Sequence, residues 1–385
     1  MFGTTQNLKE PSKVVLYEEG LRFIGGNQRY ISLLTKYAPT VGMDLVIITP
    51  SSEDQATFLK QSRIEVLDCK KGVLGYFERI YKLTSYLLKS RVEALLCNNS
   101  LSLAVVIFPA IISRTPVILH IKVSKRDKLL DLFARFLVSR VLLISARVLD
   151  KKSKWVRRFC YPSYHVLPIG IELDRFLQIQ EPPPHQGLRV LIISRIERLK
   201  GLDLLLEAIE ILDQNASDIV ISICGGVGSA IGISNQDEAY AQEIKERATR
   251  LTHRNVIFLG WQEDVVPFLQ NTDIVALPSR SEGVPRSLVE AMAASRPVLA
   301  TNVGGIPDLV IDGETGILIP VDDAEQLAKK LIWFRDHPVE RRQMGQKARA
   351  YVASKHDIKT HVELLAQHIR RVSKASVDRW RFHKE

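Results

Sequence analysis

The chain has 385 residues, of which 46% are hydrophobic and 25% charged, and its formal net charge is +10. This length exceeds what one hydrophobic core usually serves, so we expect a globular protein of two domains. No apolar run reaches the roughly 18 residues of a membrane-spanning helix, and the N-terminus lacks an apolar signal core. The four cysteines form neither a CxxC pair nor a metal-type cluster, which predicts a reducing, cytoplasmic setting.

Short apolar, β-branched runs alternate with helical segments along most of the sequence. We expect strands at 13–17, 44–49, 64–67, 92–98, 116–121, 141–145 and 165–168, and again at 188–194, 218–225, 255–260, 273–278 and 297–302. We expect helices at 75–89, 128–138, 324–335 and 356–372. Continuous apolar strands between helices are typical of parallel sheets covered on both faces. The predicted fold class is therefore α/β, with two Rossmann-like, doubly wound units in series.

Three consecutive prolines stand between the two units. Because they cannot join a helix or a central strand, we expect a linker at 181–187. It separates an N-terminal domain, 1–180, from a C-terminal domain, 188–367. Ligands bind at the carboxyl ends of the strands in such sheets, so we expect the site in a cleft between the domains.

Two strand-to-helix turns carry residues that suit a diphosphate. Gly25 and Gly26 let the backbone approach a phosphate, and the following helix offers free N–H groups. Arg195 and Lys200 flank the loop after the strand at 188–194, where two cations can neutralise a leaving diphosphate. A glycine pair is often only a turn, and exposed loop cations are an equally good reading of the second segment. The pattern is not GxGxxG, which argues against a dinucleotide dehydrogenase.

Two glutamates follow the buried strand at 273–278. Glu282 stands in a turn before Gly283, and Glu290 lies eight positions later in a helix that begins near Arg286. A carboxylate accepts two hydrogen bonds from vicinal hydroxyls, so one acid can hold a sugar and the other a ribose. The free N–H groups between them suit a phosphate. Glu290 is equally readable as a residue that interacts with the helix dipole.

The spacing Glu282-x₇-Glu290, within PSRSEGVPRSLVEAMAASRPVLATNVGGIPDLV, resembles the signature of retaining glycosyltransferase family four. Other segments match it in order and spacing: Ser194-Arg195 with Lys200-Gly201, Val303-Gly304-Gly305, Asp312–Gly316, and the early Gly25-Gly26. The similarity runs from about residue 25 to 353 and is most specific in the C-terminal half. It implies the GT-B fold, with two Rossmann-like domains facing across a cleft, and a final helix, at about 368–385, that packs on the N-terminal domain.

The resemblance also implies a site that transfers sugar from a nucleotide sugar without an essential metal. Its catalytic residues are implied to be Glu282, Arg195, Lys200 and His120. Its donor-binding residues are implied to be Gly25, Gly26, Gly283, Val284, Pro285, Arg286, Glu290 and Trp261. The family's histidine is often followed by Asp, whereas this chain has Ile121-Lys122, and a histidine at a strand end is otherwise as often structural. Trp261 is near the expected base, although a core or rim aromatic is an equal reading.

We therefore expect a hexosyltransferase that uses a UDP- or GDP-sugar and a hydroxyl of a glycan, lipid-linked or other acceptor. The alternatives are a nucleotide-sugar epimerase and a catalytically silent nucleotide-sugar binder. Twelve Lys/Arg against three Asp between Lys122 and Arg158, with a basic tail, predict an anionic partner. An anionic membrane face, contacted through the helix at 128–138, competes with a merely solvated surface. Nucleic acid is disfavoured because no aromatic residues are interleaved with the basic ones.

Overall fold

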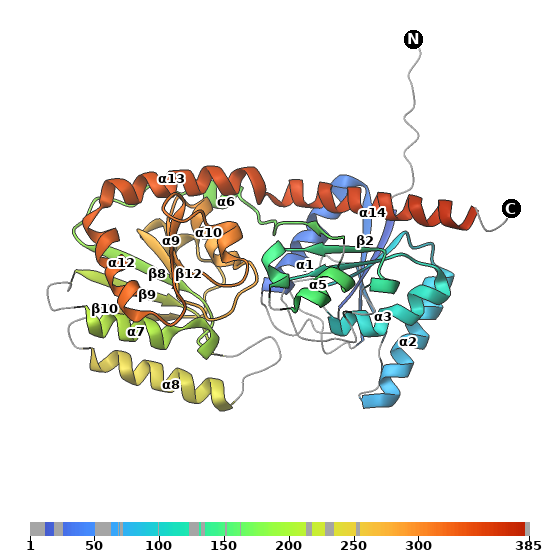
Figure 1. Cartoon of the computed structure of the whole chain (residues 1–385), viewed down its shortest axis with the longest axis horizontal. Coiled ribbons are helices and arrows are strands. Elements are labelled where there is room, and N and C mark those ends of the chain that lie inside the picture. Colours follow the sequence, from blue (N-terminus) through green and yellow to red (C-terminus); the bar gives the residue numbers. More distant parts are fainter. Residues whose placement is uncertain are drawn as a thin grey trace, which may run out of the picture.

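The structure is a computed structural model. It describes residues 12–18, 26–50, 63–67, 69, 72–98, 100–122, 131, 135–150, 152–161, 163–212, 218–227, 235–251 and 255–381. Two domains lie side by side, and each contains one β-sheet (Figure 1). Every strand pair in both sheets is parallel, which confirms the predicted α/β class.

The first sheet has seven strands in the order β3-β2-β1-β4-β5-β6-β7. Their bounds are β1 Ser12–Tyr17, β2 Met43–Thr49, β3 Arg63–Val66, β4 Ala94–Cys97, β5 Val117–Ile121, β6 Arg140–Leu143 and β7 His165–Val166. The central strands β4 and β5 are buried at every residue, as continuous apolar runs predict. All seven expected runs in this half contain a strand; β4 has four residues in place of seven and β7 has two in place of four.

Helices cover both faces of the first sheet. On one face lie α1 (Gly26–Tyr37) and α14 (Ile358–Arg381), whose buried side chains share a core with alternate residues of β1, β2 and β4. On the other face lie α2 (Gly72–Lys89), α3 (Ser100–Ser113) and α5 (Lys154–Cys160), which share a core with the opposite set of strand residues. Short 3₁₀ helices occupy Ala38–Val41 (η1) and Ala146–Leu149 (η4). Of the helix expected at 128–138, the structure describes only 131 and 135–138.

The second sheet has six strands in the order β10-β9-β8-β11-β12-β13. Their bounds are β8 Leu188–Ile193, β9 Ile219–Cys224, β10 Asn255–Gly260, β11 Ile274–Leu277, β12 Val298–Thr301 and β13 Gly316–Ile319. The helices are α6 Asp174–Leu177, η5 Arg198–Lys200, α7 Leu202–Ile211, α8 Asn235–Arg250, α9 Val266–Gln270, α10 Arg286–Ala293, α11 Ile306–Leu309, α12 Ala324–Asp336 and α13 Pro338–Lys355. No strand was expected at β13, although its four residues are apolar or glycine.

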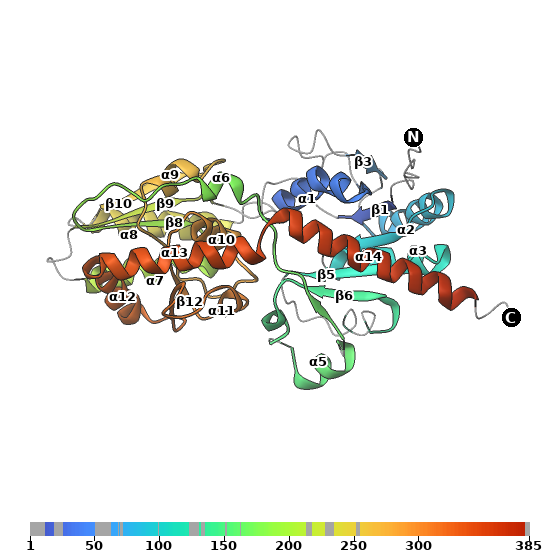
Figure 2. The same cartoon turned by 90° about the horizontal axis from the view of Figure 1, so that it is seen from above.

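The chain passes between the domains twice, at neighbouring points. The N–H of Ile171 donates to the carbonyl of His356 (2.9 Å), and the N–H of Ile358 donates to the carbonyl of Ile171 (3.0 Å). Before this crossing α13 lies along the second domain, and after it α14 lies along the first. The two helices therefore run end to end (Figures 1 and 2). The helix that covers the first sheet therefore begins at Ile358.

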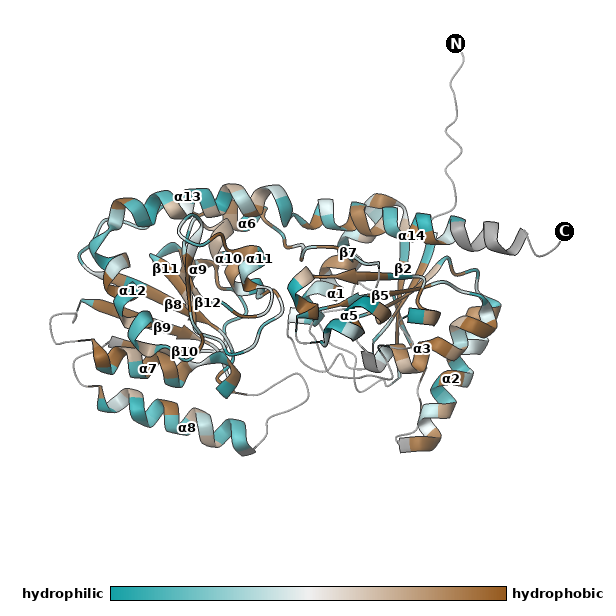
Figure 3. Cartoon of the chain, viewed as in Figure 1, coloured by the Kyte–Doolittle hydropathy of each residue, from teal (hydrophilic) through white to brown (hydrophobic). Residues whose placement is uncertain are grey.

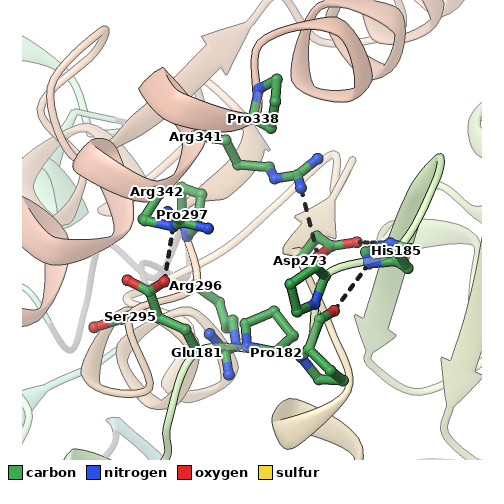
Figure 4. A pocket seen from close by; sticks show the side chains of 12 residues that line it. Glu181, Pro182, His185, Asp273, Ser295, Arg296, Pro297, Pro338, Arg341 and Arg342 are labelled. Carbon is green, nitrogen blue, oxygen red and sulfur yellow. Dashed lines mark hydrogen bonds and ion pairs between the residues drawn. The ribbon is translucent and has the colours of Figure 1, made fainter.

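The proline-rich segment at 181–187 is held against the second domain (Figure 4). Glu181 forms an ion pair with Arg342 of α13 (2.7 Å). His185 lies 2.9 Å from the carboxylate of Asp273, a buried residue that directly precedes β11 of the second sheet. Because both ends of the segment are bound to the same body, the passage between domains lies at residue 171 and not within the prolines.

Candidate active site

Loops that follow the strands of the two sheets contact each other at the domain boundary. Ser145, which follows β6, donates a hydrogen bond to the carboxylate of Asp308, and Arg147 Nε lies 2.9 Å from the same carboxylate. Gly305 lies so near that a Cβ on it would sit 3.0 Å from that of Ser145. The carboxyl edges of both sheets, where ligands bind in folds of this type, therefore face the same boundary.

Lys200 and Glu282 form the central contact on the second domain. The amine of Lys200 lies 2.7 Å from Glu282 Oε1, which also accepts a hydrogen bond from the hydroxyl of Ser279 (2.8 Å). The lysine side chain is 16% exposed and that of the glutamate 9%. The structure thus brings together two residues 82 positions apart that were singled out separately.

Glycines permit this contact by letting the loops approach closely. Gly201 has a φ of +70°, and a Cβ on it would lie 2.0 Å from the carbonyl oxygen of Pro278. The loop after β8 therefore rests directly on the loop after β11, which orients Lys200 toward Glu282. Gly304, in the loop after β12, also permits a close approach, because a Cβ on it would lie 1.9 Å from the carbonyl oxygen of Glu282.

The loop between Glu282 and α10 contains the expected phosphate-facing residues. The N–H of Gly305 donates to the carbonyl of Gly283 (2.7 Å), which fixes this loop against the one after β12. Pro285 is buried and precedes α10 in extended conformation, whereas Val284 is half-buried. The N-terminal end of α10 is thus held next to Glu282, where its N–H groups favour a bound anion.

Glu290 lies inside α10 and pairs with Arg286 one turn earlier. Arg286 Nε is 2.7 Å from Glu290 Oε1, and the carboxylate side chain is 4% exposed. A second nitrogen of this guanidinium, Nη1 of Arg286, is buried and has no hydrogen-bond partner among the described residues. A buried donor without a partner is destabilising on its own, so it is a natural point of contact for a polar ligand.

Arg29 of α1 reaches from the first domain to this cluster. Its Nη2 donates to the carbonyl of Glu263 (2.9 Å), and its guanidinium lies 5.8 Å from the ring centroid of Trp261. Burial lowers the pKa of Arg29, and the charge of Glu290 partly opposes that shift. Trp261 is 52% exposed, so it is a rim aromatic and not part of the core. Sequence reasoning missed Arg29, because its spacing from Trp261 becomes visible only once the two domains meet.

Arg195 follows β8 and Gly26 begins α1, and neither forms part of the Lys200–Glu282 contact. The guanidinium of Arg195 pairs with Glu197 (2.9 Å), and its side chain is 40% exposed. Gly26 is the first residue of α1, and among the described residues no atom would lie within 4 Å of a Cβ placed on it. These residues therefore do not obstruct a phosphate that approaches the helix N-terminus. Gly25 lies outside the described residues.

His120, the penultimate residue of β5, lies in a buried polar cluster of the first domain. Its Nδ1 lies 3.4 Å from the hydroxyl of Tyr30, which in turn is 2.9 Å from Nε2 of His361 on α14. Burial, and next the charge of Lys122, lower the pKa of His120. Its Nε2 is buried and has no partner of good hydrogen-bond geometry among the described residues, although the backbone of Leu167 acts on the pKa of the ring in the opposite direction to burial.

A second group that sequence reasoning missed connects the ends of β1 and β5. The amine of Lys122 lies 2.7 Å from Asn27 Oδ1, and Asn27 Nδ2 donates to Glu18 (3.0 Å). The amine also lies 3.6 Å above the ring of Tyr30. Burial lowers the pKa of Lys122 to about 7, against the opposing charge of Glu18. The sequence does show a polar residue directly after each of these two strands, Glu18 after β1 and Lys122 after β5, and this pattern could have indicated the group.

Several buried side-chain atoms that lack a partner lie near the carboxyl ends of strands in the two sheets. Among the described residues, four such atoms are Thr49 Oγ1, His120 Nε2, Ser194 Oγ and Arg286 Nη1. Thr49 and His120 lie at the carboxyl ends of β2 and β5, Ser194 directly follows β8, and Arg286 begins the helix after β11. Native proteins pair nearly all buried polar atoms, so unpaired ones on both carboxyl edges indicate a polar ligand between the sheets.

Residues 175–351 match the family model described as "Glycosyl transferases group 1". The second domain belongs to the group 1 glycosyl transferases. This match confirms, for that domain, the family resemblance seen in the sequence. The group 1 region contains Arg195, Lys200, Trp261, Glu282 and Glu290, whereas Gly26 and His120 precede it.

Curated relatives of the group 1 domain are similar over part of their length. The D-inositol 3-phosphate glycosyltransferase of Corynebacterium diphtheriae is 34% identical over 167 residues, which are 42% of this chain and 38% of the relative. The amylovoran biosynthesis glycosyltransferase AmsK of Erwinia amylovora is 32% identical over 174 residues, 44% of this chain and 41% of that protein. The chain thus spans about two fifths of the length of the curated relatives it matches.

Solved structures extend the similarity to both domains. A glycosyltransferase from Rickettsia africae covers 94% of this chain, with 99% of its own chain aligned, at a TM-score of 0.81 and 16% identity. Anabaena Alr3699/HepE, in complex with UDP and glucose, covers 93% of this chain and 99% of its own, at a TM-score of 0.76 and 19% identity. These similarities establish the GT-B fold for the pair of domains.

Proposed function

We propose that the protein is a retaining glycosyltransferase that moves a hexose-type sugar from a UDP- or GDP-sugar to an acceptor hydroxyl. The contact between Lys200 and Glu282 carries this proposal. This contact places a cation and a carboxylate, both nearly buried, at the carboxyl edge of the second sheet, where its loops meet the first domain. A cation suits the diphosphate that leaves, and a carboxylate suits the hydroxyls of the sugar that is transferred.

The donor lies, in this proposal, between α10 and the N-terminal end of α1. Glu290 accepts hydrogen bonds from the ribose hydroxyls, and Arg286 offers its unpartnered nitrogen to the same end of the nucleotide. Trp261 and Arg29 border the base, and Gly26 faces the phosphates. The Anabaena structure with UDP and glucose supports a nucleotide-sugar donor for this fold.

The transfer step breaks the bond between the anomeric carbon and the phosphate oxygen of the diphosphate. A bond forms on the same face between that carbon and the acceptor oxygen, whose proton passes to the departing phosphate. Arg195 and Lys200 neutralise the diphosphate as it leaves, with backbone N–H groups and without an essential metal. Donors aimed at developing charge lower the barrier because they are oriented before the reaction begins. Glu282 and His120 hold the sugar during transfer.

We further propose that the first domain binds the acceptor at a cytoplasmic membrane surface. Among the described residues, no helix has the length and apolarity that crossing a bilayer demands. The basic residues between Lys122 and Arg158 favour an acceptor that is lipid-linked or otherwise near anionic lipid.

Thermal unfolding with a panel of nucleotide sugars tests the donor. A ligand at 100 times its Kd stabilises the folded state by about 2.7 kcal/mol, which shifts the Tm of a domain of this size by several degrees. We expect one UDP- or GDP-sugar to raise the Tm, and the matching free nucleotide to raise it less. The same donor is then followed by NMR with candidate acceptors. Release of free nucleotide with a product of unchanged anomeric configuration supports the proposal, whereas isomerised nucleotide sugar or binding without turnover refutes it.

A further inference from the structure

Large apolar side chains are exposed on one side of the first domain. The α2–α3–α5 layer, which covers one face of the sheet, is the side on which they gather. On the opposite face, among the described residues, α1 exposes no large apolar side chain and α14 exposes only Leu364. Figure 3 shows long hydrophobic stretches along α2 and α3 on the lower side of this domain. The asymmetry calls for a partner on that side.

Helix α2 carries an exposed apolar stripe. Leu74, Phe77, Tyr81 and Leu88 are each more than 60% exposed. Their spacings of three, four and seven positions place them on one face of the helix, while Leu83 faces the core. The helix is therefore apolar on both its inner and outer faces.

Helix α3 adds to the same surface. Tyr76 of α2 donates a hydrogen bond to the carbonyl of Ala104 of α3 (3.0 Å), so the two helices are direct neighbours. Phe108, Ile111 and Ile112 of α3 are each more than half exposed. These residues, at spacings of three and four, form an outer face like that of α2.

Helix α5 combines exposed aromatic and basic side chains. The rings of Trp155 and Phe159 stack at 4.9 Å with an interplanar angle of 15°, and Phe136 lies 6.1 Å from Phe159. Trp155 and Phe136 are 64% and 65% exposed. Lys154 directly precedes Trp155, and Arg158 directly precedes Phe159. Both basic side chains are exposed. Aromatic and basic side chains therefore alternate on one solvent-facing surface.

The charges of this layer favour an anionic partner over a second copy of the chain. Among the described residues, the acids near the layer are already paired: Glu78 with Lys82 (2.8 Å), Asp150 with Arg157 (2.9 Å) and Asp131 with Lys152 (2.6 Å). A second copy of the chain, packed symmetrically, would bring the basic residues of α5 against one another. Anionic lipid headgroups would neutralise them, and Trp, Tyr and Phe are the side chains that settle at a bilayer interface.

We propose that the outer surface of the α2–α3–α5 layer docks on an anionic lipid bilayer. Its apolar side chains enter the headgroup region, and Lys154 and Arg158 contact lipid phosphates. The 3₁₀ helix η4 joins α5 to Ser145 at the domain boundary, so docking brings the candidate active site close to the membrane surface. This inference rests on the proposed function only in explaining why an acceptor site lies there.

Binding to vesicles of phosphatidylcholine, with and without phosphatidylglycerol, tests the proposal. We expect the full chain to co-sediment with the anionic vesicles at low salt and to be released by high salt. The double variant Lys154→Glu/Arg158→Glu should bind at least about 25-fold more weakly, because each cation near an anionic surface contributes about fivefold. Trp155→Ser/Phe159→Ser and Leu74→Ser/Phe77→Ser should each also weaken binding.

Matched controls lie on α13 of the second domain. Val339 is 60% exposed and Lys347 is exposed, so Val339→Ser and Lys347→Glu repeat the chemistry away from the layer. Both control variants should bind vesicles as the unchanged chain does. Brominated lipid should quench the fluorescence of the unchanged chain, and Trp155→Phe should lose most of that quenching while retaining an aromatic ring.

The outcomes separate docking from catalysis. Failure of the unchanged chain to bind anionic vesicles, or equal binding by the layer and control variants, overturns the proposal. A dimer in light scattering that Trp155→Ser/Phe159→Ser dissociates also overturns it, because the occupant would then be a second copy. Turnover of a soluble donor should be the same in Trp155→Ser/Phe159→Ser, in Leu74→Ser/Phe77→Ser and in the unchanged chain. If donor turnover is absent but vesicle binding follows the pattern above, only the proposed function fails.

Discussion

Replacing Lys200 by alanine is the sharpest test of the candidate active site. The change removes a cation 2.7 Å from Glu282 and leaves that carboxylate, 9% exposed, with the hydroxyl of Ser279. An unpaired, nearly buried carboxylate destabilises the fold by about 1–3 kcal/mol. Loss of a positioned group that stabilises the leaving charge lowers kcat by a factor of about 10² to 10³. We therefore expect a crippled but folded enzyme.

The assay is donor turnover by purified variants, with thermal unfolding in parallel. Arg198→Ala is the matched control, because Arg198 lies in the same loop with a side chain that is 67% exposed and 3.6 Å from Glu243. It should change turnover by no more than about twofold. The double variant Lys200→Ala/Glu282→Ala should lose little more activity than the worse single variant, because the pair acts as a unit. Turnover near normal in Lys200→Ala, or equal losses in Lys200→Ala and Arg198→Ala, would refute the assignment.

Three further predictions concern binding, the domain boundary and pH. Glu290→Gln should weaken donor binding by about 10- to 100-fold in calorimetry without unfolding the chain, because the carboxylate that pairs with Arg286 is lost; an unchanged Kd would contradict the ribose role. Asp308→Asn should loosen the contact with Arg147, so the radius of gyration in X-ray scattering should increase while the Tm stays close to that of the unchanged chain. Burial lowers the pKa of His361 to about 4, below the usual value near 6.5. As the pH falls from 6.5 towards 4, the unfolded chain therefore binds a proton that the folded chain does not, and the free energy of unfolding decreases. His361 should contribute about 2 kcal/mol to the loss by pH 5 in denaturant titrations, and His361→Gln should remove that share. Lowered pKa values of His120, His356 and His368 leave a smaller slope in the variant; an identical pH slope in the variant would refute the cause.

The fold was predictable because its signal is local. Continuous apolar runs, interrupted by helical patterns, lie in the chain order of the strands, and a parallel sheet is the arrangement that buries such runs on both faces. The same argument could not find the passage between domains, since three prolines resemble a free linker. Whether they are free depends on Arg342 and Asp273, which lie far away in the sequence.

The site was predictable only where each residue sits on its own loop at a strand end. Lys200 and Glu282 were found separately, and the glycines beside them allow the contact. Arg29 and Lys122 were missed because their importance depends on which loops meet. Lys122 and Asn27, for example, are 95 positions apart, and no local pattern connects them.

The return of α14 to the first domain has a consequence for biogenesis. Its buried residues, from Ile358 to Val372, complete the core beneath one face of the first sheet. Domains generally fold as units while the ribosome is still elongating the chain. The first domain can bury this face only after almost all of the second has been translated, so we expect the second domain to reach its native state first.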